Sequence, residues 1–447
     1  MRMALNTSYK QILSISIPIM LGGAAQNIIA LSDSVFLYHL SELDFAAIGF
    51  VSVFYLIIAA IGFSFSKGGQ IIVARRFGQG ELENAGRSFY AMLYFEFALS
   101  IIMFCFMFFG ADWFFQFFIK SEAIHQKSLA YLDYRSFGVF FSYIGIGIVA
   151  FLTGIAKNKF IIYNTLVLVG VNIILNYSLI YGKFGLPEMG IAGAGLASTI
   201  AEICAFTMFM IYIITDKSLG DFKLNRLPKI DLSIIKNIFK IASPVVAQSI
   251  VGLGSWFIFF SLVESIGERE LAMSNLARMV YLMLSIPTWG YASGVNTLVS
   301  HFIGRNRRQV VMPIIHKTTK ITLLTTLIMA LPIILFPKFT LYPLFGSEDM
   351  SLITETQPIL YIVFLILITF SIGGIYFNGL AGTGATYFGL KMQAFCSFVY
   401  LSSIYIIVKV LDLGLYWAWS IEFFYWGLMF IISMLYLRSK KWYSIKV

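Results

Sequence analysis

The segment from Ser16 to Leu40 reads SIPIMLGGAAQNIIALSDSVFLYHL, and the interpretation of the whole chain starts from it. It is long and apolar enough to cross a bilayer as a helix, yet it contains one carboxylate, Asp33. An ionisable side chain in a spanning segment costs roughly 2.5–3.5 kcal/mol on insertion scales, and it typically faces a cavity, an ion path or a proton relay. We therefore expect Asp33 to be functional, with a satisfied structural carboxylate as the alternative.

The composition of the chain extends this reading to its full length. Of its 447 residues 59% are hydrophobic and only 12% are charged, and the mean hydropathy is +0.84. A soluble protein of this size needs more polar surface, and the apolar runs lack the period-two alternation of a membrane barrel. The first residues, MRMALNTSYKQ, show no cleavable signal pattern, so we expect the first apolar segment to be retained. The sequence predicts an all-α polytopic membrane protein.

We expect twelve membrane-spanning helices. Their approximate ranges are 12–39, 46–76, 86–118, 128–157, 160–182, 190–215, 234–264, 271–303, 311–337, 353–382, 387–410 and 415–437. Lys and Arg gather in alternate loops and in the C-terminal tail, whereas the opposite loops are acidic or poor in basic residues. By the positive-inside rule this predicts that both termini are cytoplasmic. The net charge of +10 therefore indicates topology, and we expect no nucleic-acid partner.

The two halves of the chain repeat. Pro18 and Pro244 are 226 residues apart, and the same offset relates Gly68 to Gly294. Six spans, a basic connector and six similar spans predict two pseudo-symmetric six-helix bundles inserted the same way round. The predicted segments are an N-terminal lobe at 1–216, a cytoplasmic connector at 217–233 and a C-terminal lobe at 234–447.

Polar residues in the first half are candidate partners for Asp33. Asn172 and Asn176 are four residues apart and so share one helix face. Ser198 and Thr199 end the small-residue stretch GIAGAGLAST, which allows close helix packing. This oxygen-rich set suits Na⁺, and the same surroundings also allow the carboxylate to carry a proton. Plain hydrogen bonding between helices explains the asparagines equally well.

Three further features complete the reading from the residues alone. Pro18 lies deep in the first span and predicts a hinge, because a proline removes one backbone hydrogen bond. Glu202 and Glu422 occupy similar places in spans 6 and 12 and indicate packing roles, whereas Glu96 is a weak site candidate with no obvious partner. The three cysteines and four histidines show no metal-ligand spacing, so no bound metal other than Na⁺ and no cofactor is expected.

Three motifs together resemble the multidrug and toxic compound extrusion (MATE) family. They are P-x7-Q-x6-D from Pro18 to Asp33, GGQIIVARRFGQG at 68–80, and N-x3-NYSLIYGKFGLPEMGIAGAGLAST at 172–199. The resemblance covers essentially the whole chain. It implies antiport, in which an inward Na⁺ or H⁺ gradient drives export of organic, often cationic compounds. It also places Asp33, Asn172, Asn176 and Ser198 on the cation site of the family's N-terminal lobe.

The resemblance has departures as well. Carboxylates that many bacterial members carry in spans 7 and 10 would fall on Gly252 and about Ser371 in this chain. Coupling through the N-terminal lobe alone, as in the DinF-like branch, fits better. Within that reading we expect Gln26, Asn27 and Tyr55 to line the substrate cavity.

The function predicted from the sequence is a secondary active multidrug efflux antiporter that couples at Asp33. It is expected to act as a monomer in the lipid bilayer on small organic substrates. The alternative is a lipid-linked oligosaccharide flippase of the same superfamily, which the absence of Lys and Arg from span 12–39 disfavours. A membrane enzyme finds no support, since neither a catalytic cluster nor a nucleotide-binding motif is present.

Overall fold

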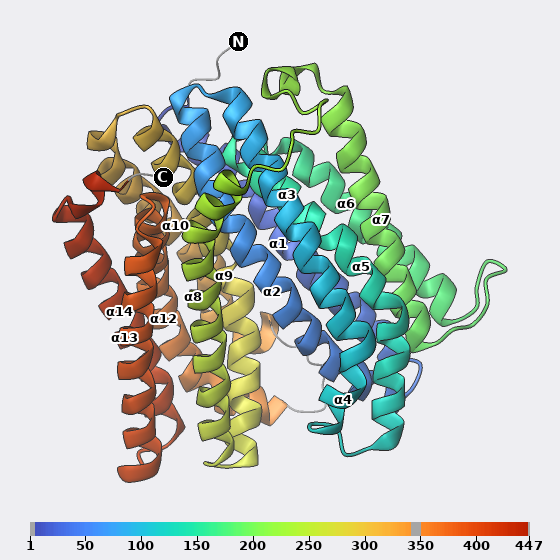
Figure 1. Cartoon of the computed structure of the whole chain (residues 1–447). Coiled ribbons are helices and arrows are strands. Elements are labelled where there is room, and N and C mark those ends of the chain that lie inside the picture. Colours follow the sequence, from blue (N-terminus) through green and yellow to red (C-terminus); the bar gives the residue numbers. More distant parts are fainter. Residues whose placement is uncertain (1–4, 341–349, 446–447) are drawn as a thin grey trace. The chain divides into compact units, whose positions relative to one another are not determined.

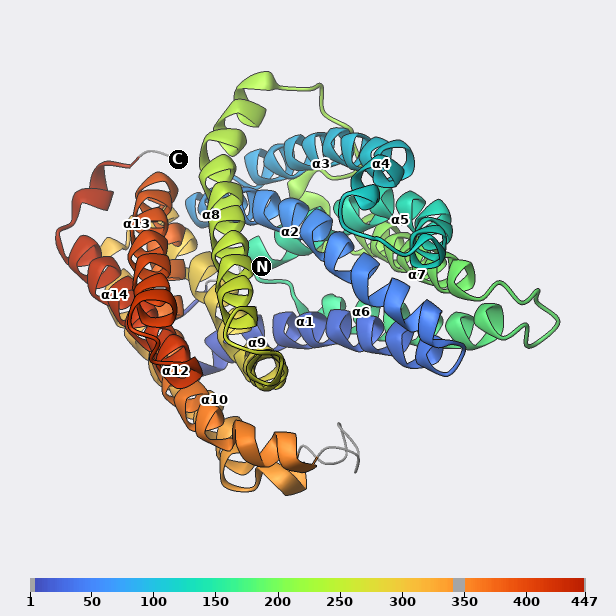
Figure 2. The same cartoon turned by 90° about the horizontal axis from the view of Figure 1, so that it is seen from below.

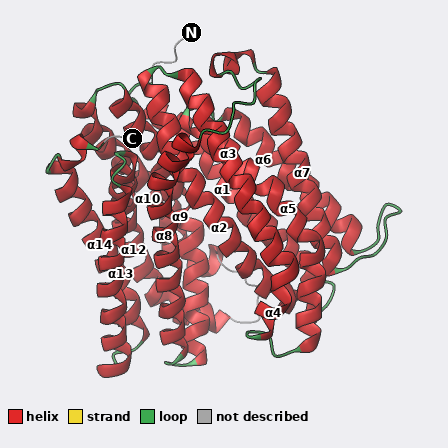
Figure 3. Ribbon diagram, viewed as in Figure 1, coloured by secondary structure: helices red, strands yellow, loops and turns green. Residues whose placement is uncertain are grey.

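The computed structural model describes residues 5–340 and 350–445, and within these ranges the chain is helical with no strand (Figure 3). Twelve of the described helices have 20 or more residues. Ten helices are long and apolar enough to cross a membrane, and α1 and α9 are the two other long ones. The predicted all-α polytopic membrane architecture is confirmed.

The long helices follow one another along the chain, and short helical elements lie in several of the connections (Figure 1). They are α1 (Tyr9–Tyr38), α2 (Glu42–Gln79), α3 (Leu82–Cys105), α5 (Glu122–Gly154), α6 (Lys159–Ile180), α7 (Ile191–Thr215), α8 (Leu232–Glu264), α9 (Glu268–Gly304), α10 (Val311–Leu335), α12 (Met350–Gly382), α13 (Thr386–Tyr405) and α14 (Leu415–Arg438). The short elements are η1 (Phe106–Gly110), α4 (Ala111–Gln116), η2 (Lys217–Phe222), η3 (Arg308–Val310), η4 (Ile406–Val410) and η5 (Lys441–Ser444).

The chain divides by packing into two compact units. Unit 1 comprises residues 1–20 and 243–447, and unit 2 comprises residues 21–242. Both boundaries fall inside long helices, within α1 close to Pro18 and within α8 close to Pro244. Residues 1–20 thus pack with the C-terminal half, whereas the sequence-based segments place them in the N-terminal lobe.

Each unit contains the same set of helix pairs, which can be followed in Figure 2. In unit 2, α2 packs on α3 and α5, α3 packs on α5, and α7 packs on α5 and α6. In unit 1, α9 packs on α10 and α12, α10 packs on α12, and α14 packs on α12 and α13. The helix order is the same in both sets, so the predicted pair of pseudo-symmetric bundles is confirmed.

The repeat can be aligned from equivalent helix starts. Helices α5 and α12 both have 33 residues and begin 228 residues apart. The same offset relates the left-handed residues Ala156 and Gly384, which precede α6 and α13. Helices α7 and α14 follow Gly190 and Gly414, which both have a positive φ, and this gives an offset of 224. These offsets define which residues of the two units are equivalent.

Small residues bring α7 close to its neighbours in unit 2. A Cβ on Gly195 would lie 2.4 Å from the carbonyl oxygen of Tyr131 on α5. A Cβ on Gly193 would lie 2.7 Å from the carbonyl oxygen of Leu179 on α6. These approaches need glycine, because any larger residue would clash with backbone. The GIAGAGLAST stretch therefore fixes α7 against the two helices that carry the polar partners of Asp33.

Candidate cation-coupling site

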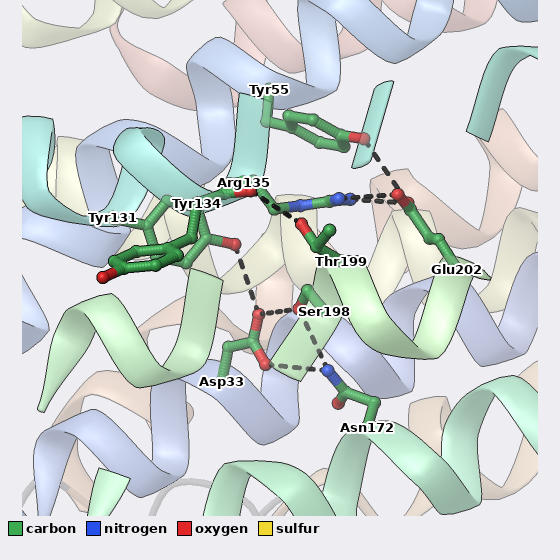
Figure 4. Close-up of polar contacts among 9 residues, drawn as sticks. All are labelled: Asp33, Tyr55, Tyr131, Tyr134, Arg135, Asn172, Ser198, Thr199 and Glu202. Carbon is green, nitrogen blue, oxygen red and sulfur yellow. Dashed lines mark hydrogen bonds and ion pairs between the residues drawn. The ribbon is translucent and has the colours of Figure 1, made fainter. Parts of the chain in front are cut away.

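The Asp33 carboxylate lies in the interior of unit 2 and is only 4% exposed. Asn176 Nδ2 donates to its Oδ1 at 2.5 Å, and Asn172 Nδ2 approaches the same oxygen at 3.4 Å. Ser198 Oγ donates to Oδ2 at 3.2 Å, and the Tyr131 hydroxyl reaches Oδ2 at 3.5 Å (Figure 4). Four donors from three helices, α5, α6 and α7, therefore converge on one carboxylate.

The partners of Asp33 also hydrogen-bond one another. Asn172 Nδ2 donates to Ser198 Oγ at 3.0 Å, and Asn176 Nδ2 lies 3.2 Å from Asn172 Oδ1. Asn176 Oδ1 is buried, and in the described part of the chain it has no hydrogen-bond partner. A buried amide oxygen without a donor is costly, so this atom is available to a cation or to water. The structure brings Asp33, Asn172, Asn176 and Ser198 together.

The cluster contains the kinds of oxygen atom that a small hard cation prefers. They comprise the two carboxylate oxygens, two amide oxygens and a hydroxyl, which are the ligand types that hard cations prefer. The same carboxylate can instead accept one proton. The cluster thus fits either Na⁺ or H⁺, with Asp33, Asn172 and Asn176 as the candidate Na⁺ ligands.

Thr199 faces away from this cluster. Its hydroxyl donates to the carbonyl oxygen of Tyr134 on α5 at 2.9 Å, although it neighbours Ser198 in sequence. The helix geometry explains the difference, because consecutive helical residues point about 100° apart. Thr199 therefore joins α7 to α5, and the structure does not bring it to the Asp33 carboxylate.

A second polar layer lies one helical turn from the first. Arg135 on α5 and Glu202 on α7 form a bidentate ion pair, with nitrogen–oxygen distances of 2.6 and 2.7 Å (Figure 4). The side chains are only 7% and 13% exposed. The guanidinium carbon of Arg135 lies 3.8 Å from the centroid of the Tyr55 ring. The Tyr55 hydroxyl lies 3.4 Å from Glu202 Oε1. Tyr55 thus belongs to a charged layer, and the expected packing role of Glu202 is replaced by an ion pair.

The ion pair and the Asp33 cluster are connected through their helices. Arg135 follows Tyr131 by four residues, and Glu202 follows Ser198 by four, so the two layers are about 6 Å apart along α5 and α7. Arg135 and Glu202 neutralise each other. An ionised Asp33 then leaves a net charge of −1, which one monovalent cation balances. The sequence-based prediction did not include Arg135, although it is the only basic residue of span 128–157 apart from the terminal Lys157.

Other predicted residues fall in less informative places. Pro18 is a buried residue inside α1, and its role as a hinge stays a prediction. Gln26 and Asn27 belong to α1, but their side chains lie outside the described residues. Glu96 does have a partner, contrary to expectation: Ser66 Oγ donates to it at 2.5 Å inside unit 2.

Gly252 and Ser371 stand where many bacterial members of the family have a carboxylate in spans 7 and 10, and both residues are uncharged. Ser371 hydrogen-bonds to Thr326 and lies 3.2 Å from the hydroxyl of Thr288. Gly252 faces the side-chain amide of Gln393, 3.5 Å from where a Cβ would stand. Neither position carries a charge, so these two places in unit 1 offer no counterpart to Asp33.

A sequence model of the MatE family matches residues 18–178 and 244–406, which includes the corresponding parts of both halves. The chain belongs to the MatE family. The chain is 24% identical to the "Probable multidrug resistance protein NorM" of Bradyrhizobium diazoefficiens over 67% of this chain and 64% of that protein, just under two thirds of its length. It is 22% identical to the protein of the same name from Thermotoga maritima, over 92% of this chain and 88% of that one.

The fold is also that of a solved MATE transporter. A structure described as the outward-facing conformation of a multidrug resistance MATE family transporter of the MOP superfamily superposes with a TM-score of 0.88. It covers 96% of this chain and 95% of the other, at 20% identity. MATE proteins are transporters rather than enzymes, and the ten long apolar helices of the described residues are those of a multi-pass membrane protein.

Proposed function

We propose that this MATE protein is a secondary active efflux antiporter, which exports small organic compounds in exchange for an inward flow of H⁺ or Na⁺. The observation that carries the proposal is the buried Asp33 carboxylate, held by four donors and left without a countercharge after Arg135 and Glu202 have paired. The relatives named as multidrug resistance proteins support an organic substrate.

In the proposed cycle, a proton or Na⁺ binds Asp33 and neutralises the site. The buried Asn176 Oδ1 and the amide oxygen of Asn172 support Na⁺ as one coupling ion. Neutralisation changes which arrangement of α1 is favoured, and Pro18 is the proposed point of bending. The substrate binds when Asp33 is charged, and Gln26, Asn27 and Tyr55 are proposed to line its cavity.

We place the protein in a bacterial inner membrane with both termini on the cytoplasmic side and propose that it acts as a monomer. Its lobes at 1–216 and 234–447 are proposed as the moving parts, joined by the segment 217–233. The flippase alternative gains no support from Arg135, because Glu202 already engages both terminal nitrogens of its guanidinium group. A pyrophosphate would have to displace a bidentate carboxylate there.

The test is efflux of ethidium from proteoliposomes under separately imposed Na⁺ and H⁺ gradients. Wild-type protein is expected to export with at least one gradient, and Asp33→Asn is expected to lose gradient-driven export while inserting normally. Asp412→Asn is the matched control, since Asp412 is exposed in a loop and asparagine tolerates its positive φ. Gradient-driven export by Asp33→Asn at the wild-type rate would refute coupling at this residue.

A further inference from the structure

The place in unit 1 that is equivalent to the Asp33 cluster also contains a carboxylate, contributed by a different helix. The offsets of 226, 228 and 224 make Phe259, Tyr400 and Glu422 the equivalents of Asp33, Asn172 and Ser198. Phe259 and Tyr400 are in ring contact, with centroids 6.3 Å apart. In unit 1 the acid therefore lies on the last helix of the repeat, α14, whereas in the first half Asp33 lies on the first helix, α1.

Glu422 is buried on α14 and is held by aromatic side chains. It is 5% exposed. Trp426 Nε1 donates to its Oε1 at 3.1 Å, and the polar groups of Tyr400 and Trp256 are further neighbours of the carboxylate. Every one of these groups is a donor, so the carboxylate is held as an acceptor.

The rings around Glu422 form a continuous wall. Contacting pairs with centroids 4.5–5.8 Å apart run in order through Trp256, Tyr281, Phe370, Trp426, Tyr425 and Tyr400. Gln393 fixes one end of the wall, because its Nε2 donates to the Tyr425 hydroxyl at 2.6 Å. Trp256, Tyr425 and Trp426 are only partly buried, so the described residues do not enclose the wall completely.

The charge of Glu422 is not balanced by the described residues of unit 1. The equivalent of Arg135 is Val363, which is fully buried, and no basic side chain in the described ranges pairs with Glu422. Glu202 in unit 2 thus has its counter-ion built in, whereas Glu422 has none. A membrane-embedded carboxylate in this situation must take up a cation from outside the protein to remain charged.

We propose that Glu422 and its aromatic wall form a binding site for an organic monovalent cation in the C-terminal unit. One carboxylate among ring faces is the chemistry that recognises alkyl- and aryl-ammonium groups. Na⁺ does not fit, because its ligands would be one carboxylate and few other oxygens. The site rests on the proposed function in so far as organic cations are the exported compounds, but it is distinct from the coupling site at Asp33.

Ethidium binding to the purified full-length protein in detergent tests the site, with fluorescence anisotropy as the readout. Glu422→Gln keeps the shape and hydrogen-bond acceptor but removes the charge, and it is expected to weaken binding about tenfold, with a smaller loss in Trp256→Leu. Glu264→Gln, at the exposed end of α8, is the control and should bind as wild type. Phenanthridine, the neutral parent ring, should bind wild type and Glu422→Gln equally.

Equal ethidium affinity in wild type and Glu422→Gln would overturn the site. If that variant fails to fold, photolabelling of the wild-type chain with azido-ethidium decides the matter: adducts on Trp256, Tyr425 or Trp426 support the site, and adducts confined to unit 2 refute it. The outcome is separable from that of the efflux experiment. Asp33→Asn should retain the Glu422-dependent binding, whereas wild-type export by Asp33→Asn would refute the coupling proposal and leave the binding result intact.

Discussion

The polar centre of unit 2 and the aromatic centre of unit 1 occupy equivalent places in the repeat. Each contains a buried carboxylate, but the groups that surround the two carboxylates differ. In unit 2 Asp33 is surrounded by amide and hydroxyl groups, and the nearby Glu202 is neutralised by Arg135. In unit 1 Glu422 is surrounded by rings and has no basic partner among the described residues. Oxygen ligands favour a small inorganic cation or a proton, and rings favour an organic one. A duplicated scaffold can therefore carry the coupling site in one copy and, besides the cavity proposed at Gln26, Asn27 and Tyr55, a second site for an organic cation in the other.

The largest expected effect separates the two acids by their kinetics. Asp33→Asn should lower the maximal rate of gradient-driven ethidium export about 100-fold, because the neutral amide neither takes up a proton near neutral pH nor supplies the negative charge that balances Na⁺. Glu422→Gln should mainly raise the KM for ethidium, since it removes substrate binding rather than coupling. Initial rates in proteoliposomes over a range of ethidium concentrations measure both quantities. A fall in maximal rate with unchanged KM in both variants would erase the proposed division of roles.

The second prediction concerns the counter-ion that only unit 2 possesses. Arg135→Met should destabilise the protein by about 3–5 kcal/mol, because it leaves the Glu202 carboxylate buried without its partner. The double variant Arg135→Met with Glu202→Gln should recover most of that loss, since no uncompensated charge remains. Thermal unfolding of the detergent-purified variants measures the effect. Equal stability of the single and double variants would show that Glu202 does not need Arg135.

A smaller effect is expected from the helix contact that positions the Asp33 cluster. Gly195→Ala should cost about 1–3 kcal/mol, because its Cβ would lie 2.4 Å from the Tyr131 carbonyl oxygen and force α7 away from α5. Gly145→Ala on α5 is the matched control, since its Cβ would meet no atom within 4 Å. That substitution should be neutral or stabilising by about 0.4–1 kcal/mol. Thermal unfolding and the export rate should both separate the two variants.

The smallest effect concerns an acid outside the membrane-spanning helices, between α7 and η2. Burial acts to raise the pKa of Asp216, but hydrogen bonds from Ser218 and Tyr212 and the charge of Lys157 outweigh it and hold the pKa below the usual value. A lowered folded-state pKa stabilises the protein above the ordinary aspartate pKa, and the contribution is lost as pH falls through the folded-state value. Asp216→Asn should therefore cost under ~1 kcal/mol at neutral pH.

The pH series provides the check on that last prediction. The difference in thermal stability between wild type and Asp216→Asn should shrink as the pH falls below the ordinary aspartate pKa. A difference that grows on acidification would mean that the carboxylate is destabilising in its charged form.

The fold and the neighbours of Asp33 could be read from the sequence because they depend on patterns local to single helices. Span lengths, the i, i+4 spacing of Asn172 and Asn176 and the small residues before Ser198 all have this character. The pairings between helices were the part that could not be read. Whether Arg135 faces Glu202 depends on the rotation of α5 against α7, which apolar periodicity leaves undetermined when both helices are apolar on all sides.

The same limit explains why the surroundings of Glu96 and Glu422 could not be predicted from the sequence. The partner of Glu96, Ser66, is 30 residues away on another helix, and serine is too common in these spans to single out one residue. The rings around Glu422 come from five helices, α8, α9, α12, α13 and α14, so no sequence window contains them. Thr199 shows the reverse error, in which a residue next to a site in sequence points elsewhere in space.

The inclusion of residues 1–20 in unit 1 has a consequence for any attempt to take the protein apart. Met20 and Ser16 lie against Gly290 and Gly294 on α9, so the start of the chain supplies part of the packing of the C-terminal half. If the chain were divided within the segment 217–233, the second fragment would lack part of its packing. The first fragment would keep the start of α1 without the helix α9 against which it packs. Separately made halves are therefore expected to need each other, and to regain a stable fold only by complementation in the same membrane.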